Sequence, residues 1–415
     1  MASGTGQLPL FATGGSNFCN FRWSQGCAPV DKIIHAFTLS IAPLEYGRTP
    51  HPDTITKRVI CNHQRSSRMF KARARAIDSF ALRIAYRECG LPGTSRQQYY
   101  VYMETLNERY CSLSSRRRYE VWFVRVGLVD GSGAWWFRYL LTNPGRRGCP
   151  NDPRGMPVQV WASFFPRDGK PQSFIQGFPL NDLDISAEGQ NPFHFRIGPN
   201  EIGESLCRGN LQLEGHSLTW NLECLSNFGV TLSSKGWIGF SRTPHSDALY
   251  SGGITLDGRS FGGAPLGFGV QGHNCGYRHR NFWTWAHAYF PRAGSPPSTL
   301  EALVYEMPFG LIFRKAVLWH DGKKHKFKNL QEISRHQLEF CWRFYCSSSD
   351  GYRLQAVIDG TGLSIHRLPY LRTNCTGDFE VTNNSLARAV LRLEQRDRPI
   401  ETLETGVGAV LEMVG

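Results

Sequence analysis

Residues 267–290 read GFGVQGHNCGYRHRNFWTWAHAYF and are dense in large aromatic and titratable side chains. The pattern predicts two strands joined by a basic loop. In the second strand, alternation puts four residues on one face, because successive strand side chains point to opposite sides. The other face is also largely apolar, so we expect burial on both sides, as in the wall of a filled barrel. The four residues are Trp283, Trp285, His287 and Tyr289.

Composition describes an ordinary globular protein of 415 residues with a basic surface. Hydrophobic residues make up 41% of the chain and charged residues 20%. No apolar run approaches the roughly 18 residues of a membrane helix. The formal net charge of +13 favours anionic partners. The sequence carries no zinc finger, RNP-type aromatic motif or basic zipper, so we expect no specific nucleic-acid binding.

The 12 cysteines are scattered without close pairing spacings. A chain of this length does not need covalent cross-links to fold, so we expect free thiols in a reducing compartment. The N-terminus lacks the basic-then-apolar pattern of a signal peptide, although the absence of acids before Asp31 leaves an organellar presequence open. These observations predict a cytoplasmic protein.

Residues 1–118 are expected to form an N-terminal extension, partly disordered, with one basic helix. Residues 1–55 are rich in Gly, Ser, Thr and Pro, which is typical of loops. Over residues 67–88 apolar side chains recur at helical spacing, and Gly90 and Pro92 supply a stop signal. The basic face of this helix is a candidate for peripheral contact with anionic membranes. The alternative is a solvent-exposed basic face on a helix that packs against the protein, and we favour it about twofold over membrane contact.

From residue 119 onward, short strands separated by glycine-containing turns predict antiparallel sheet closed into barrels. A second set of strands of similar size follows Gly252 and Gly253. We therefore expect a mainly β protein with two tandem barrels, over residues 119–255 and 256–415. The clearest hairpin signals are Asp130-Gly131-Ser132-Gly133, Arg167-Asp168-Gly169-Lys170 and Glu214-Gly215-His216.

The pattern His273-Asn274-x-Gly276 followed by Trp283-x-Trp285 resembles the signature of the lipocalin-like superfamily of carotenoid hydratases, tocopherol cyclases and lipocalin-like [4+2] cyclases. The likeness covers roughly residues 119–415. It implies two lipocalin-like β-barrels, an apolar ligand near the domain interface and, in the members that are enzymes, cofactor-free chemistry on polyenes or prenyl quinols. Supporting pieces are Tyr119-Glu120-Val121-Trp122, Trp136-Phe137-Arg138-Tyr139, and residues 375–381 and 408–412.

The chain departs from this signature on both sides of the His-Asn pair. In the family the pair commonly follows an acidic residue and precedes Trp, whereas this chain has Gly272 and Cys275. The acid would be the natural proton donor for hydration or cyclisation of an alkene. His273 and His287 are candidates to replace it, because imidazole titrates near neutrality. Other acids on predicted strands, for which a solvent-facing rim position is favoured, are Glu120, Asp378, Glu380 and Glu412.

The candidate catalytic residues are His273, Asn274 and His287. Trp283 and Trp285 could stabilise a developing carbocation by cation–π attraction, although aromatic residues that simply fill a barrel explain them equally well. His273, His279, His287 and Cys275 are weak candidates for a metal site, because neither Cys-x-x-Cys nor His-Glu-x-x-His occurs here. We therefore expect no metal and no cofactor. The candidate substrate-binding residues are Trp283, Trp285, Tyr289, Tyr277 and Trp122.

The favoured function is cofactor-independent cyclisation, hydration or isomerisation of a hydrophobic polyene or prenylated small molecule. The alternative is a lipocalin-like carrier that binds an apolar ligand without transforming it. The missing acid before His273 favours the carrier, and the retained His273 and Asn274 favour the enzyme.

Overall fold

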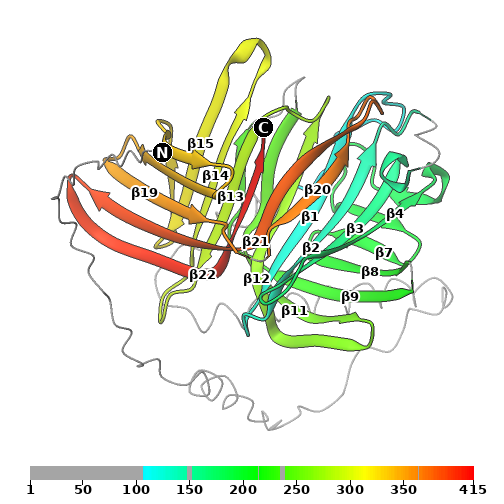
Figure 1. Cartoon of the computed structure of the whole chain (residues 1–415), viewed down its shortest axis with the longest axis horizontal. Coiled ribbons are helices and arrows are strands. Elements are labelled where there is room, and N and C mark those ends of the chain that lie inside the picture. Colours follow the sequence, from blue (N-terminus) through cyan, green and yellow to red (C-terminus); the bar gives the residue numbers. More distant parts are fainter. Residues whose placement is uncertain (1–105, 147–151, 214, 234–238, 363) are drawn as a thin grey trace, which may run out of the picture. The chain divides into compact units, whose positions relative to one another are not determined.

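The computed structural model describes residues 106–146, 152–213, 215–233, 239–362 and 364–415 (Figure 1). Throughout these ranges the chain forms antiparallel strands joined by turns and short 3-10 segments, without an α-helix. The predicted mainly β class is therefore confirmed. The basic helix predicted over residues 67–88 lies outside the described residues. In the described part, no helical segment is long and apolar enough to cross a membrane.

The first sheet has 12 strands in the order β4-β3-β2-β1-β12-β11-β9-β8-β7-β6-β5, with β10 paired to β11. Figure 1 shows them in cyan to yellow-green. The strands are β1 (Tyr119–Leu128), β2 (Gly133–Thr142), β3 (Val158–Pro166), β4 (Gln172–Phe178), β5 (Leu183–Ile185), β6 (His194–Ile197), β7 (Asn200–Gly203), β8 (Leu206–Leu213), β9 (His216–Leu225), β10 (Val230–Ser233), β11 (Gly239–Leu256) and β12 (Arg259–Gly276).

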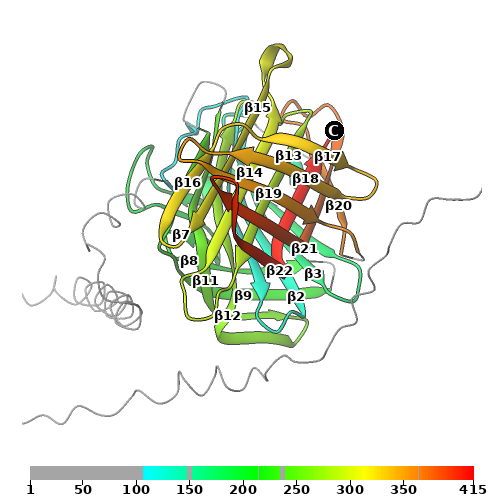
Figure 2. The same ribbon diagram turned by 90° about the vertical axis from the view of Figure 1, so that its left-hand side faces the viewer.

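The second sheet has 10 strands in the order β16-β15-β14-β13-β22-β21-β19-β18-β17, with β20 paired to β21. Figure 2 shows this sheet from its own side. The strands are β13 (Trp283–Phe290), β14 (Ser298–Glu306), β15 (Ile312–His320), β16 (Lys323–Phe327), β17 (Gln331–His336), β18 (Cys341–Ser347), β19 (Tyr352–Asp359), β20 (His366–Leu371), β21 (Asp378–Gln395) and β22 (Arg398–Val414).

The hairpins predicted from turn sequences are present in the first sheet. β1 pairs with β2, β3 with β4 and β8 with β9, all antiparallel. In the first turn the Ser132 N–H donates to the Asp130 carboxylate at 2.8 Å, and Gly131 has a φ of 67°. Glycine adopts positive φ without steric cost, which is why the turn sequences located these elements correctly.

Strand alternation divides the apolar side chains among three clusters. One lies inside the first sheet, around Trp122 and Phe137. Another lies inside the second sheet, around Trp342 and Phe344. The third joins outward-facing residues of both sheets, so the space between the sheets is itself apolar and aromatic. Its large members include Phe123, Trp136, Trp161, Phe228, Trp285, Trp319 and Tyr370.

The stretch 267–290 contains the end of β12 and all of β13, the two predicted strands, but these strands do not pair with each other. β12 pairs with β1 and β11, and β13 pairs with β14 and β22. Because both edges of each strand are already hydrogen-bonded, the loop between them leads from one sheet to the other. The sheets divide between Gly276 and Trp283, whereas we expected a barrel boundary after residue 255, which lies within β11. β13 is buried on both faces, as predicted.

Arg125 on β1 connects the two sheets through a fully buried guanidinium group. The group donates to the carbonyl oxygens of Ser385, Val407 at 2.8 Å and Ala409 at 3.2 Å, all on the second sheet. Desolvation lowers the pKa of Arg125 to about 9. Carbonyl oxygens thus take the place of water around this charge, and removing them would leave it without solvation.

The described cysteines do not all fit the expectation of free thiols. Six are buried and form no disulfide, and Cys375 forms one. The prediction is therefore wrong at Cys375, because scattered spacing in the sequence does not report which residues meet in space. The cysteines outside disulfides are Cys111, Cys207, Cys224, Cys275, Cys341 and Cys346.

Candidate active site

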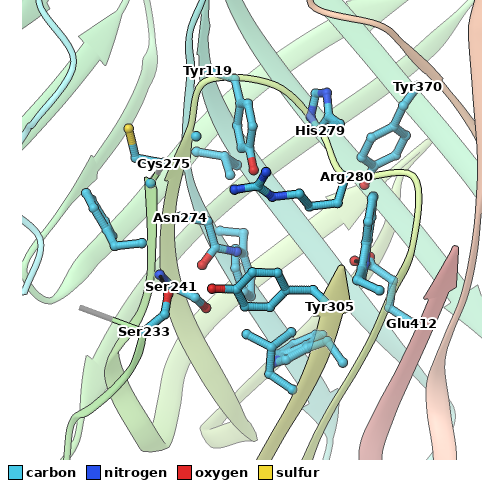
Figure 3. A pocket seen from close by; sticks show the side chains of 18 of the residues that line it. Tyr119, Ser233, Ser241, Asn274, Cys275, His279, Arg280, Tyr305, Tyr370 and Glu412 are labelled. Atoms are coloured by element: carbon cyan, nitrogen blue, oxygen red, sulfur yellow. Dashed lines mark hydrogen bonds between the residues drawn. The ribbon is translucent and has the colours of Figure 1, made fainter. Parts of the chain in front are cut away.

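A pocket opens between the two sheets, beside the third apolar cluster, and spans about 930 Å³ including the space at its mouth. Its walls come from β1, β2, β10, β11 and β12 of the first sheet and from β13, β14, β20 and β22 of the second. The loop 277–282 contributes as well. Figure 3 shows aromatic and polar side chains from both sheets converging on this space. The mixed apolar and polar lining suits a small-molecule site.

Glu412 on β22 brings a carboxyl group to the pocket wall. The Trp283 indole donates to its Oε1 at 2.8 Å, and the Asn383 amide donates to its Oε2 at 3.3 Å. Desolvation raises the pKa of Glu412, against the lowering effect of the nearby Arg138 charge. Such a carboxyl keeps its proton at a higher pH than an exposed one, which suits a general acid.

A second buried carboxyl group lies behind the wall. Trp285 lines the pocket and donates its indole N–H to Glu301 Oε2 at 3.1 Å. Burial raises the pKa of Glu301 to about 7, against the hydrogen bonds from Thr243 and Trp285. Glu301 is not one of the residues that line the pocket. The two tryptophans of Trp283-x-Trp285 therefore each hold a buried acid, one facing the pocket and one behind it.

Arg138 on β2 places a guanidinium group on the wall. It donates to the Tyr370 hydroxyl and lies 4.5 Å from the ring centroid of Tyr370 and 4.8 Å from that of Trp161. Its buried Nε has no hydrogen-bond partner in the described structure. A buried donor without a partner is suited to bind an oxygen atom of a ligand.

Tyr119 and His279 stack at one end of the pocket, with ring centroids 4.2 Å apart. Burial raises the pKa of Tyr119 to about 12 and lowers the pKa of His279 to about 3. Both groups are therefore neutral near pH 7. The hydroxyl of Tyr119 can donate a hydrogen bond, and Nδ1 of His279 has no partner within the described residues.

Asn274 is the one predicted catalytic residue that lines the pocket. Its side-chain oxygen is buried and has no hydrogen-bond partner among the described residues. Figure 3 shows Asn274 beside the hydroxyl end of Tyr305, which also lines the pocket. Since buried polar atoms normally have a partner, this amide is available to orient a ligand.

His273 points into the first sheet, away from the pocket. Its Nδ1 lies 2.7 Å from the Leu106 carbonyl oxygen and its Nε2 lies 2.8 Å from Glu120 Oε1. Both ring nitrogens are therefore engaged away from the pocket, which leaves His273 no atom with which to touch a ligand there.

His287 is also buried outside the pocket lining, with Nε2 2.8 Å from the Ser246 carbonyl oxygen. Burial lowers the pKa of His287 to about 3, so the ring is neutral and Nε2 is the donor. Within the described residues, no three His, Cys, Asp or Glu side chains gather as a metal site would require.

The predicted binding residues divide in the same way. Trp283 and Trp285 line the pocket. Tyr289 instead stacks on Phe268 with centroids 4.8 Å apart, and Trp122 belongs to the core inside the first sheet. Tyr277 is 42% exposed. Of the eight predicted site residues, the structure therefore gathers Asn274, Trp283 and Trp285 at the pocket and places the other five elsewhere.

Several pocket residues were not singled out from sequence. Trp136 and Arg138 are two residues apart on one strand and share a face, so a charge on an aromatic face was the available signal. No comparable signal marks Tyr119, Tyr305 or Tyr370, because their convergence depends on how the two sheets pack. Among the acids weighed from sequence, Glu412 lines the pocket, whereas Glu120 is bound to His273 and Asp378 and Glu380 pair with Arg154 and Arg367.

The position before the His-Asn pair has a physical reason to be glycine. A Cβ atom at Gly272 would lie 2.1 Å from the ring of Phe123. That ring lines the pocket and makes an edge contact with Trp285 at 5.5 Å between centroids. An aromatic ring thus occupies the space in which the acid of the resembling family would begin.

No protein-family model and no curated protein sequence matches this chain. Its fold is similar to a crystal structure of CghA with Sch210972, with a TM-score of 0.53 at 12% identity over 72% of this chain and 89% of that one. Kievitone hydratase from Nectria haematococca aligns with a TM-score of 0.46 at 11% identity, over 78% of this chain and 97% of that one. At these identities the likeness to CghA shows the lipocalin-like fold and nothing finer.

Proposed function

We propose that this protein is a cofactor-independent cyclase, hydratase or isomerase that acts on a hydrophobic small molecule between its two sheets. The observation that carries the proposal is Glu412, a buried carboxyl group with a raised pKa on a wall that is rich in aromatic side chains. The similarity in fold to CghA, which has been crystallised with Sch210972, supports a small-molecule ligand.

The charges around the pocket favour one type of activation. A developing carbocation would be repelled by the guanidinium group of Arg138. The tryptophans alone therefore do not make the site favourable for a cation. Negative charge growing on a ligand oxygen would instead be stabilised by donors already in place. We therefore propose a conjugated carbonyl compound as substrate, with Arg138 and the Tyr119 hydroxyl binding its oxygen.

In this proposal Glu412 delivers a proton or a strong hydrogen bond. Its two oxygens accept from Trp283 and Asn383, which fixes the carboxyl group in the wall. Asn274 orients the substrate from the opposite sheet, and the rings of Phe123 and Trp285 hold its apolar part in a reactive conformation. His273 and His287 have no proton-transfer role here, and His273 instead fixes β12 next to Asn274.

The carrier of an apolar ligand is the alternative function. Phe123 in the place of the family's acid favours it, because that ring closes the space from which a proton would come. Isothermal titration calorimetry with conjugated polyene carbonyl compounds, followed by mass spectrometry for products, separates the two functions. Binding without product for every compound that binds would establish the carrier.

The decisive variant is Glu412→Gln, with Glu301→Gln as the matched control. Both residues are buried and accept from a pocket tryptophan, but only Glu412 lines the pocket. We expect Glu412→Gln to bind substrate and to lose about 100-fold or more of its turnover, as is usual when a general acid is removed. Glu301→Gln should lose little. Equal turnover in the two variants would contradict the assignment.

A further inference from the structure

The hairpin between β14 and β15 ends in an exposed apolar tip. Its sequence is Met307-Pro308-Phe309-Gly310-Leu311-Ile312, and Phe309 is 98% exposed and Leu311 62% exposed. Figures 1 and 2 both show this hairpin projecting past the ends of the neighbouring strands. A large ring in water gains nothing for folding, so its exposure calls for another explanation.

The backbone conformation of the tip is also unfavourable for a large side chain. Phe309 has a φ of 67° and a ψ of 24°, in the left-handed region that bulky residues rarely adopt. Pro308 before it and Gly310 after it complete a tight turn that directs the chain back along β15. The structure thus holds an aromatic side chain outward at the apex in a conformation that a smaller or polar residue would fill more easily.

The tip adjoins the pocket. Tyr305 lines the pocket and stacks on Phe313 of β15 at 4.8 Å, and the two residues are paired across the hairpin. Phe309 is four residues from each of them, which corresponds to at most about 13 Å even for extended chain. An object that touched the tip would therefore also lie close to the pocket at Tyr305.

Basic residues flank the base of the tip in β15 and in the neighbouring loop. Arg314 on β15 is exposed, whereas the Lys315 ammonium group donates to the Thr231 and Leu232 carbonyl oxygens at 3.0 and 2.8 Å. Arg278 and Arg280 precede β13 in a loop whose Phe282 carbonyl oxygen accepts the Glu306 N–H at 3.1 Å. The Arg280 guanidinium lies 5.8 Å from the Tyr305 ring centroid. Exposed apolar side chains next to basic ones are complementary to an anionic phospholipid surface. The lipid charge attracts the basic side chains, and the apolar side chains enter the boundary between headgroups and acyl chains.

We propose that the 307–312 tip inserts into the surface of an anionic phospholipid bilayer and so brings the pocket mouth to the lipid. A stable protein partner would need about 1,200 Å² of buried surface or more, which a pointed tip of three apolar side chains does not offer. Docking itself does not depend on the reaction proposed above. Only its use, the uptake of an apolar substrate from the membrane, rests on that proposal.

The test is flotation of the full chain with vesicles of phosphatidylserine and phosphatidylcholine, and with vesicles of phosphatidylcholine alone. The test variant is Phe309→Ser with Leu311→Ser. The matched control is Ile333→Ser with Leu338→Ser, since those side chains are 53% and 100% exposed elsewhere on the second sheet. We expect binding to anionic vesicles to weaken about tenfold or more in the test variant and to be unchanged in the control.

The charge component has its own variant. Arg278→Gln with Arg314→Gln should weaken binding to the anionic vesicles and leave the weak binding to neutral vesicles as it was. Wild-type binding by the tip variant, or equal losses in the tip and control variants, would overturn the proposal. It would also be overturned if size-exclusion chromatography showed that the tip variant only converts a dimer to a monomer while vesicle binding persists.

Discussion

Two buried glutamates, one in each sheet, show why burial alone does not make an acid reactive. Glu120 lies inside the first sheet and accepts from the backbone N–H groups of Tyr110 and Cys111 at 2.8 and 2.6 Å as well as from His273. Glu412 accepts from two side chains and faces the pocket. The Glu120 carboxyl group is enclosed by its hydrogen-bond partners, whereas the Glu412 carboxyl group can still contact a ligand.

Removing the Glu120 carboxyl group should have the largest effect on stability. Glu120→Ala leaves the His273 ring and two backbone N–H groups without their buried partner, so we expect a loss of about 3–5 kcal/mol in the free energy of unfolding. Urea denaturation followed by tryptophan fluorescence measures it. Glu412→Gln is the reference and should cost less than about 1 kcal/mol, because the amide keeps the shape. Similar losses in the two variants would show that the sites do not differ as described.

A carboxyl group can also be added where the resembling family has one. Gly272→Asp should destabilise the fold by about 1–3 kcal/mol, because the new Cβ meets the Phe123 ring. Phe123→Ala in the same chain removes the obstacle, so the double variant should be more stable than the sum of the two single changes predicts. Additive losses would mean that the ring is not what requires glycine at this position.

Glu301, which is buried like Glu120 and lies behind the pocket wall, should make the stability depend on pH. Its pKa is raised from 4.5 to about 7, so the folded state binds its proton more tightly than the unfolded state. Stability from this group is complete below about pH 4.5 and is lost as the pH rises to 7, by up to about 3 kcal/mol. Glu301→Gln should flatten that decline in denaturation curves taken across this pH range. An unchanged slope would contradict the raised pKa.

Much of the fold could be predicted from sequence because its determinants are local. Turn residues such as Gly131 located hairpins, and two-sided apolar patterning marked β13 as buried. The pairing of β12 with β1 and of β13 with β22 joins segments more than a hundred residues apart, and no local pattern reports it. The assignment of the two sheets to separate domains stays a prediction.

One feature of the candidate site, the opposite orientation of His273 and Asn274, could have been predicted from the sequence. His273 and Asn274 are neighbours on one strand, so their side chains point to opposite faces and only one of them can line a given pocket. Which one does so depends on the packing of β13 and β22 against β12, which the sequence does not display. Glu412 lies 138 positions beyond Asn274 and meets the same space only through that packing.

The guanidinium of Arg125 bears on how the molecule can be divided. It belongs to one sheet and donates to carbonyl oxygens of the other, so a fragment ending at Gly276 would lose these acceptors and its complement would lose their donor. Each fragment would keep an apolar core of its own but would expose its part of the third apolar cluster to water. Co-expressed halves should therefore recover solubility only as a pair.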